Sequence, residues 1–255
     1  DTMNSIPTAD LANTLTKVLQ LTVPPVAIAF LDSVPAGVGT FGGQVPAGCR
    51  FWQEASSRVF ATVARDHDMC SIGIYTHHLD STAAVQRDLQ DTLKVLGDLT
   101  YVRPEDMPFI PVLNREAKVV VYGPLKLIPV VPDVVLLFVK SDQALILSEA
   151  SQQLEQGVPP ALGRPACAVI PQAINTGRTA LSLGCCGARA YLDLLTPDMA
   201  LYAIPAKTLL AFTERVEALA KANSILTQFH AIRRREAEAG KHPTVGESLS
   251  ALSAQ

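Results

Sequence analysis

The sequence has little charge and few cysteines. Of its 255 residues 18% are charged and 48% are hydrophobic, which excludes wholesale disorder. Five cysteines are far too few for a disulfide-stapled scaffold, and a chain of this length can bury a sizeable core without one. The net charge of -3 argues against a dedicated nucleic-acid binder.

Long hydrophobic runs are also missing. The longest, at 125–139, is interrupted by Lys126, two prolines and Asp133, so we expect no membrane-spanning segment. The segment from Asp1 lacks the positive and apolar regions of a signal peptide, although Asp1 is not an initiator and a removed signal stays open. We therefore expect a cytoplasmic protein, whose reduced thiols serve as ligands, nucleophiles or core residues.

Several catalytic motifs are absent. The sequence contains no GxSxG, HExxH or GxxxxGK[ST] pattern. Residues 37–42 spell GxGxxG, but no helix is expected to begin there, so a nucleotide site is not predicted.

Apolar periodicity predicts a mixed α/β (α+β) fold, with a mixed central sheet, flanking helices and a long C-terminal helix. We expect one domain over 1–239, made of two halves at about 8–110 and 111–239, and a flexible tail at 240–255. Thr8 or Asp10 is expected to cap the first helix and Ser141 a later one. The expected helices are 8–21, 49–58, 71–79, 82–96, 141–157 and 206–239, and the expected strands are 26–31, 59–63, 117–122, 134–139, 166–170 and 179–183.

Three cysteines stand at predicted loop-to-helix junctions, where backbone amides are free to bind a thiolate. Cys49 follows a glycine-rich loop at 32–48, Cys70 follows Asp66-His67-Asp68-Met69, and Cys185 lies in Gly184-Cys185-Cys186-Gly187. No pair has CxxC spacing, so a zinc ribbon is not indicated. Dispersed thiols suit a centre assembled by the tertiary fold, holding zinc or an iron–sulfur cluster.

The other two cysteines have different settings. Cys167 lies in an apolar stretch predicted to be a strand, which favours a structural role in the core. Cys186 is adjacent to Cys185, and neighbouring side chains diverge, so one of the two is expected to be a ligand. Cys186 therefore remains the alternative to Cys185.

Polar residues near these cysteines are candidates for chemistry. His67 could be a fourth ligand, a hydrogen-bond donor to a sulfur or an acid–base group, or simply an exposed turn residue. At most one of His77 and His78 is expected to face a site. Arg189 could orient an anionic substrate, or pair with Asp193 instead.

The ordered motifs resemble those of the uncharacterised DUF169 family of bacteria and archaea, over roughly residues 10–215. The matching pieces are Thr22-Val23-Pro24-Pro25-Val26-Ala27, Gly48-Cys49, Asp66-His67-Asp68-Met69-Cys70-Ser71-Ile72-Gly73, Tyr122-Gly123-Pro124-Leu125, Pro132-Asp133-Val134-Val135 and Ser182-Leu183-Gly184-Cys185-Cys186-Gly187-Ala188-Arg189. By this resemblance Cys49, Cys70 and Cys185 look like the family cysteines, and Cys186 like a variable position. Three such cysteines fit a [4Fe–4S] cluster with one iron left open.

The leading hypothesis is an iron–sulfur enzyme that uses an open iron as a Lewis acid in lyase, hydrolase or desulfurase chemistry. Cys49, Cys70 and Cys185 would hold the cluster, His67 would move protons and Arg189 would hold a small anionic substrate. The first alternative is a non-catalytic cluster carrier, redox sensor or zinc-binding protein. The second is thiol catalysis by Cys70 with His67. The expected partners are a small molecule and, in a possible homodimer, a second copy of the chain, with no nucleic acid and no membrane.

Overall fold

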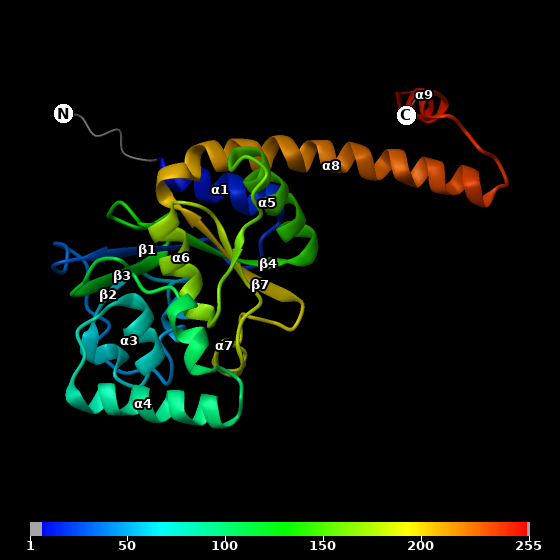
Figure 1. Ribbon diagram of the computed structural model, residues 1–255. Coiled ribbons are helices and arrows are strands. Elements are labelled where there is room, and N and C mark those ends of the chain that lie inside the picture. The colour runs from blue at the N-terminus through cyan, green and yellow to red at the C-terminus, as the bar shows by residue number, and fades with distance from the viewer. Residues whose placement is uncertain (1–6, 254–255) are drawn as a thin grey trace.

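A seven-stranded sheet forms the centre of the protein in the computed structural model, which describes residues 7–253 (Figure 1). The strand order is β2-β3-β1-β4-β7-β6-β5, and every neighbouring pair is antiparallel except β5 and β6. This mixed sheet with flanking helices confirms the predicted fold class. The strands are β1 Val26–Leu31, β2 Phe60–Val63, β3 Val119–Pro124, β4 Val134–Lys140, β5 Ala161–Leu162, β6 Ala180–Ser182 and β7 Met199–Pro205.

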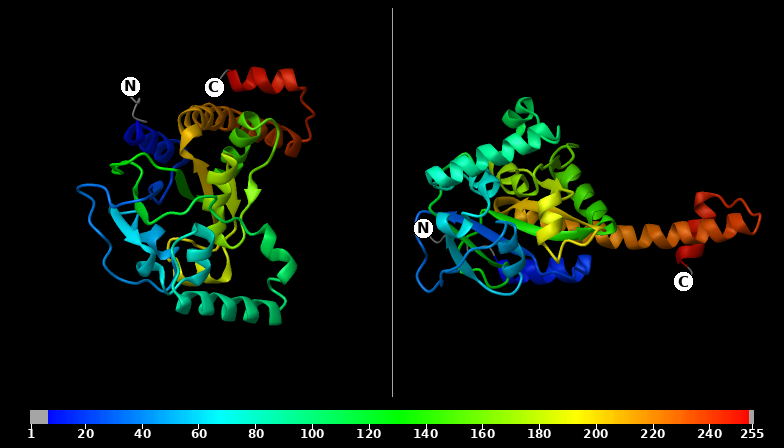
Figure 2. Two further views of the ribbon diagram at one scale, coloured as in Figure 1. Left: turned by 60° about the vertical axis from the view of Figure 1, so that its left-hand side comes forward. Right: turned by 90° about the horizontal axis from the view of Figure 1, so that it is seen from below.

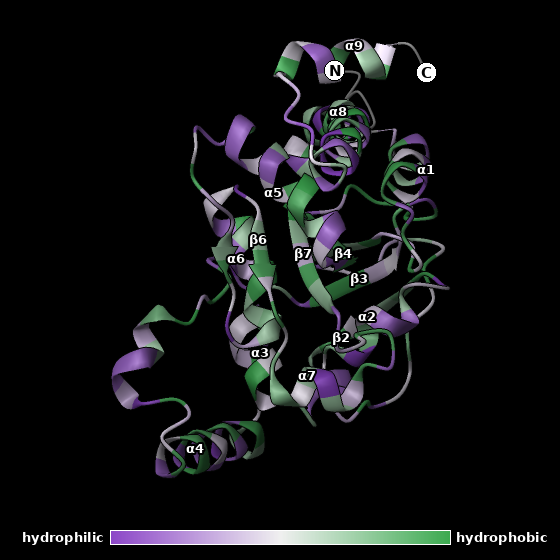
Figure 3. Cartoon of the chain, turned by 90° about the vertical axis from the view of Figure 1, so that its right-hand side faces the viewer, coloured by the Kyte–Doolittle hydropathy of each residue, from purple (hydrophilic) through white to green (hydrophobic). Residues whose placement is uncertain are grey.

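The central strands are hydrophobic on both faces because helices cover both. In β1, Val26, Ile28 and Phe30 join the core on one face, and Ala27 and Ala29 join the core on the other. This alternation follows from the two-residue period of a strand. Figure 3 shows the resulting hydrophobic colouring along the strands.

One face of the sheet is covered by α1 Thr8–Leu19, α5 Ser141–Leu154 and the first part of α8 Leu209–Glu238. Leu11, Leu15 and Leu19 of α1, spaced about one helical turn apart, are buried in this core. The other face carries the remaining helices of the body and the thiols described below. Its elements are α2 Arg50–Glu54, η1 Ala64–His67, α3 Ser71–His77, α4 Ala83–Asp98, η2 Pro104–Phe109, η3 Ala166–Ala168, α6 Val169–Thr176 and α7 Cys186–Tyr191.

The predicted strand at 166–170 is wrong. These residues form η3 and the start of α6, with Pro165 before them and Gly177 in a left-handed conformation after them. Proline before a helix and glycine after it are the ordinary signals of helix ends. The apolar run was too short for its period to separate a strand from a buried helix.

Smaller differences concern caps and two strands. Pro7 precedes α1 and Lys140 precedes α5, and neither helix has a side-chain cap from Thr8, Asp10 or Ser141. These hydroxyl and carboxyl residues lie inside the first turn. Strands β5 and β7 lie outside the predicted strands, and β7 pairs with β4 along its whole length.

The C-terminal part of the chain forms an arm. Helix α8 continues past the body of the protein, following the short η4 Ala206–Thr208, and α9 Val245–Ser253 folds back on it (Figure 2). The segment expected to be a flexible tail therefore contains a helix, and Ile232 of α8 is buried beside it. Residues 1–6, which begin the segment expected to lack a signal peptide, and residues 254–255 at the end of the expected tail lie outside the described residues. No helix within 7–253 is long and apolar enough to cross a membrane.

Candidate thiol-lined cavity

A cavity of about 600 Å³ opens on the face of the sheet that carries α2, α3, α6 and α7. All five cysteines of the chain line it, and all five are free. The other lining residues come mainly from α4, the α4–η2 connection, and the segments around η3 and α7. Residues separated by more than a hundred positions in the sequence therefore share one surface.

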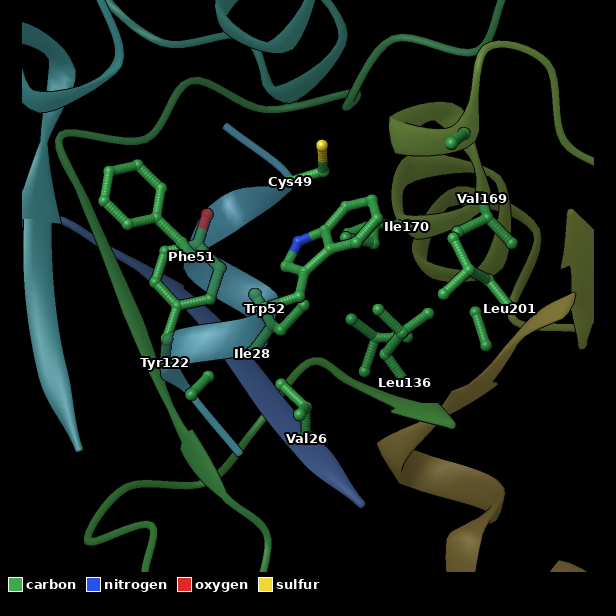
Figure 4. Packing of buried hydrophobic residues seen from close by; sticks show 14 of the residues in the cluster. Val26, Ile28, Cys49, Phe51, Trp52, Tyr122, Leu136, Val169, Ile170 and Leu201 are labelled. Carbon is green, nitrogen blue, oxygen red and sulfur yellow. The ribbon is translucent and has the colours of Figure 1, made fainter. Parts of the chain in front are cut away.

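Cys49, Cys70 and Cys185 each stand immediately before a short helix, as the sequence predicted. They occupy the positions preceding α2, α3 and α7. The backbone N–H of Ala188 donates to Cys185 Sγ at 3.4 Å. Figure 4 shows the sulfur of Cys49 pointing away from the strands, above a packed layer that includes Trp52.

The neighbouring thiols raise one another's pKa values. Burial, and then the neighbouring Cys70 and Cys185, raise the pKa of Cys49 to about 12. Burial also raises the pKa of Cys70, while the backbone N–H groups of Gly48 and Gly73 oppose that effect and Cys185 adds to it. Mutual repulsion of this kind disappears when a bound cation compensates the thiolates.

Cys167 packs against the hydrophobic core, as the sequence predicts, but it lies on η3 rather than on a strand. It also lines the cavity with the other sulfurs. Burial is the first cause of its raised pKa, and Cys70, Cys185 and Cys49 contribute as well. Its sequence setting gave no sign of this, because η3 reaches the cavity only after the chain has crossed the sheet. Cys186 is exposed at the rim.

His67 lies behind this layer of thiols rather than in the cavity lining. Its Nε2 lies 2.8 Å from Thr62 Oγ1, and its Nδ1 has no hydrogen-bond partner among the described residues. Its Nδ1 and Cys70 Sγ both face Gly48, where an added Cβ would lie 3.4 Å from the nitrogen and 3.7 Å from the sulfur. Burial and then His77 lower the pKa of His67 to about 3, so the ring is neutral at pH 7. The alternative of an exposed turn histidine is wrong.

Of the adjacent pair, His77 is the buried one. Burial lowers its pKa to about 4, and neither ring nitrogen has a hydrogen-bond partner in the described part of the chain. Its ring lies edge-on to Phe30, with centroids 5.5 Å apart. His78 points elsewhere, with Nδ1 2.9 Å from the Leu113 carbonyl oxygen. The two rings diverge, as adjacent side chains do.

Arg189 is not among the residues that line the cavity. Its guanidinium donates to the carbonyl oxygens of Leu183, Thr196 and Met199 at 2.5, 3.1 and 3.0 Å. Asp193 pairs with Arg50 at 3.0 Å, so the alternative pairing with Arg189 is wrong. Arg189 therefore holds the α7 segment, and with it Cys185, against the end of β7.

The donors that share this cavity are thiols, the ligands that zinc and iron–sulfur clusters take in proteins. Across residues 7–253, no group of three or more His, Cys, Asp or Glu side chains is arranged to hold a metal ion.

The outer part of the cavity could not be predicted from the sequence. Asp88 on α4, Asp106 on η2 and Arg164 before η3 contribute its charged side chains. None of them is close in sequence to the predicted cysteines, and no short-range pattern marks them. Only the tertiary fold brings α4 and η2 over the thiols.

The fold and the cavity define a mixed α/β protein whose distinguishing feature is a thiol-lined pocket. The chain belongs to the DUF169 family, described as "Uncharacterised ArCR, COG2043", whose match spans residues 14–215. That span contains every cysteine of the chain and ends within α8. No curated protein and no solved structure matches the chain significantly.

Proposed function

We propose that this protein is an iron–sulfur enzyme in which Cys49, Cys70 and Cys185 hold a [4Fe–4S] cluster at the floor of the cavity. When bound, such a cluster supplies an iron that is not ligated by protein and can act as a Lewis acid in lyase, hydrolase or desulfurase reactions. The observation that carries the proposal is the meeting of three thiols from three separate segments in one partly buried cavity.

The position of the thiols supports this assignment. Cys49, Cys70 and Cys185 pack in or against the hydrophobic core and also face a cavity large enough for a small-molecule substrate. Burial, and then the neighbouring thiols, raise the pKa values of Cys49 and Cys70, so thiolate formation there needs a compensating positive charge. A cationic iron centre would supply that charge.

The surrounding residues would then position the thiolates rather than exchange protons. The backbone N–H groups of Gly48 and Gly73 stabilise the thiolate of Cys70. The Thr62 hydroxyl donates to the Val120 carbonyl oxygen and accepts from His67, so the neutral ring carries its proton on Nε2, and its Nδ1 beside Gly48 is a hydrogen-bond acceptor. Arg189 fixes the segment that carries Cys185 through three carbonyl oxygens. In this proposal His67 and Arg189 support the segments that carry the thiols, instead of moving protons and holding a small anionic substrate as expected from the sequence.

A second candidate function rests on Cys167. Its position on the same cavity makes four thiols available, and four would complete the ligands of a cluster with no open iron. Such a centre suits electron transfer or redox sensing by a non-catalytic protein. Thiol catalysis by Cys70 with His67 is disfavoured, because burial raises the pKa of the thiol and lowers that of the imidazole, opposite to what an ion pair needs.

We further propose that the protein works in the cytoplasm, where reduced thiols stay available for metal binding. All five cysteines are free, which agrees with that setting. The exposed α8–α9 arm is where a second copy could bind in the proposed homodimer.

Anaerobic purification, followed by iron and sulfide analysis and an absorbance scan, tests the cluster. We expect about four irons and four sulfides per chain, and loss of both in C49S, C70S and C185S. C186S is the matched control and should retain the cluster, because Cys186 is exposed at the rim. A colourless, iron-free protein after reconstitution would refute the proposal.

C167S separates the two candidate functions. If the cluster survives with unchanged iron content, three thiols are sufficient and one iron is open. If C167S loses iron as fully as C70S does, Cys167 is a ligand and the closed cluster of the second candidate is correct. Electron paramagnetic resonance of the reduced protein provides an independent readout of the ligand change.

A further inference from the structure

The cavity is larger than the layer of thiols on its floor, and its walls above that layer are largely apolar. Its volume of about 600 Å³ falls within the range of sites that bind small organic molecules. The walls include Ile72 of α3, Leu93 and Leu96 of α4, Val102, and Ile110 after η2. A site built only for a small inorganic anion would not need this apolar space.

Apolar side chains also remain exposed at the entrance. Met69, Tyr101, Phe109 and Leu162 line the cavity and are 61%, 47%, 82% and 66% exposed. Clustered exposed apolar residues around a concavity are typical of a ligand-binding site. Their position suggests that the bound molecule extends from the thiols to the entrance.

The charged side chains of the lining differ in whether another group of the protein pairs with them. Asp106 pairs with Arg103 at 2.9 Å. Arg164 donates to the Tyr101 carbonyl oxygen, and its guanidinium lies over the Tyr101 ring at 5.3 Å from the centroid. Asp88 is exposed to solvent at the cavity and forms no ion pair or side-chain hydrogen bond with any residue in the described part of the chain, and its charge contributes to the raised pKa of Cys70.

We infer that the cavity binds a small organic molecule with an apolar, ring-sized body and one positively charged amine, held between the walls of α4 and η2 with its charge facing Asp88. An anion in the same place would meet the carboxylate of Asp88, and Arg164 is already engaged at the entrance. The inference rests on the proposed function in treating the thiol floor as the reaction centre. It replaces the small anionic substrate expected from the sequence with a cationic, largely apolar one.

Three probes with one ring system test this: 1-naphthylmethylamine, 1-naphthylmethanol and 1-naphthoate, titrated calorimetrically into the anaerobically purified protein. We expect the amine to bind about fivefold more tightly than the alcohol, as a partly exposed charge pair allows, and the carboxylate to bind most weakly. D88N should remove the preference for the amine while retaining the alcohol. D91N is the matched control, since Asp91 lies on the same helix outside the cavity lining and should leave the order unchanged.

A second variant tests the location. L93W fills the cavity from α4 and should weaken all three probes about tenfold or more, without changing the order of their affinities. The inference is overturned if the carboxylate binds as tightly as the amine, if D88N leaves the preference intact, if L93W has no effect or if no probe binds. Iron and sulfide are measured on the same sample. Binding in iron-free protein would overturn the cluster alone, and a cluster without binding would overturn this inference alone.

Discussion

Two buried imidazoles set the acid response of the protein at the scale of single residues. His67 and His77 are fully buried on the cavity side of the sheet, and their pKa values fall to about 3 and about 4. The unfolded chain exposes both rings, whose ordinary pKa is 6.5. Folding therefore excludes protons from them, and the two states bind protons equally only above pH 6.5.

We predict that stability falls as the pH drops from 6.5 toward 4, because the unfolded state gains protons there and the folded state does not. Each histidine contributes a slope approaching about 1.4 kcal/mol per pH unit. Urea denaturation at pH 7.5, 6.5 and 5.5 measures this slope. H67Q should reduce it by roughly half, whatever the variant does to stability at pH 7.5.

H230Q is the control, because His230 is an exposed residue of α8. It should retain the steep acid slope. If H67Q and H230Q give the same slope as the unaltered protein, His67 does not titrate as its burial requires.

At the scale of elements, Asp133 joins two strands where their ladder ends. Strands β1 and β4 pair only from Val26 to Ile28, and beyond that the carboxylate of Asp133 accepts the N–H of Phe30 at 2.7 Å. The second oxygen accepts from Arg115 at 2.6 Å. A side chain thus replaces the missing backbone partner and links β1 to its neighbour β4 in the interior of the sheet.

D133A should lower the free energy of unfolding by about 1–3 kcal/mol, the cost of leaving a buried N–H without its partner. D198A, which removes an exposed carboxylate paired with Lys140, should cause a smaller loss. Urea denaturation compares the two, and hydrogen exchange should report faster exchange at Phe30 in D133A alone. Equal losses in the two variants would show that Asp133 does not hold β1.

At the scale of the whole molecule, the sheet and its cavity are separate from the C-terminal arm. The buried residues of α8 that face the sheet end at Val216, residues 221–228 are exposed, and Ile232 packs within the arm. The DUF169 match also ends near this point, at residue 215. The body therefore buries its hydrophobic core without the arm.

Deletion of residues 221–255 should change the free energy of unfolding by about 1 kcal/mol or less, because residues 221–228 are exposed and the buried residues of α8 that face the sheet end at Val216. F212A, which empties a site in the core under α8, should cost about 3–5 kcal/mol. Thermal unfolding and the reaction rates of the cavity thiols measure both effects. A deletion as damaging as F212A, or one that alters thiol reactivity, would show that the arm supports the body.

The sequence by itself determined most of the elements. Strand β1, helix α4 and the long α8 have strong periods or clear turn signals, and those signals act between residues a few positions apart. The same local signals placed Cys49, Cys70 and Cys185 before helices. They failed at 166–170, where a short apolar run fits a strand and a buried helix equally well.

Only the tertiary structure decided that the five cysteines line one cavity. The sheet order brings η3 and α7 from the second half of the chain beside α2 and α3 from the first, so Cys167 joins the other thiols. It also turned Arg189 toward backbone carbonyls and buried His67 behind Gly48. Burial, pKa and cavity shape depend on neighbours that are distant in sequence, and the scarcity of cysteine in the chain gave no indication that all five would line one cavity.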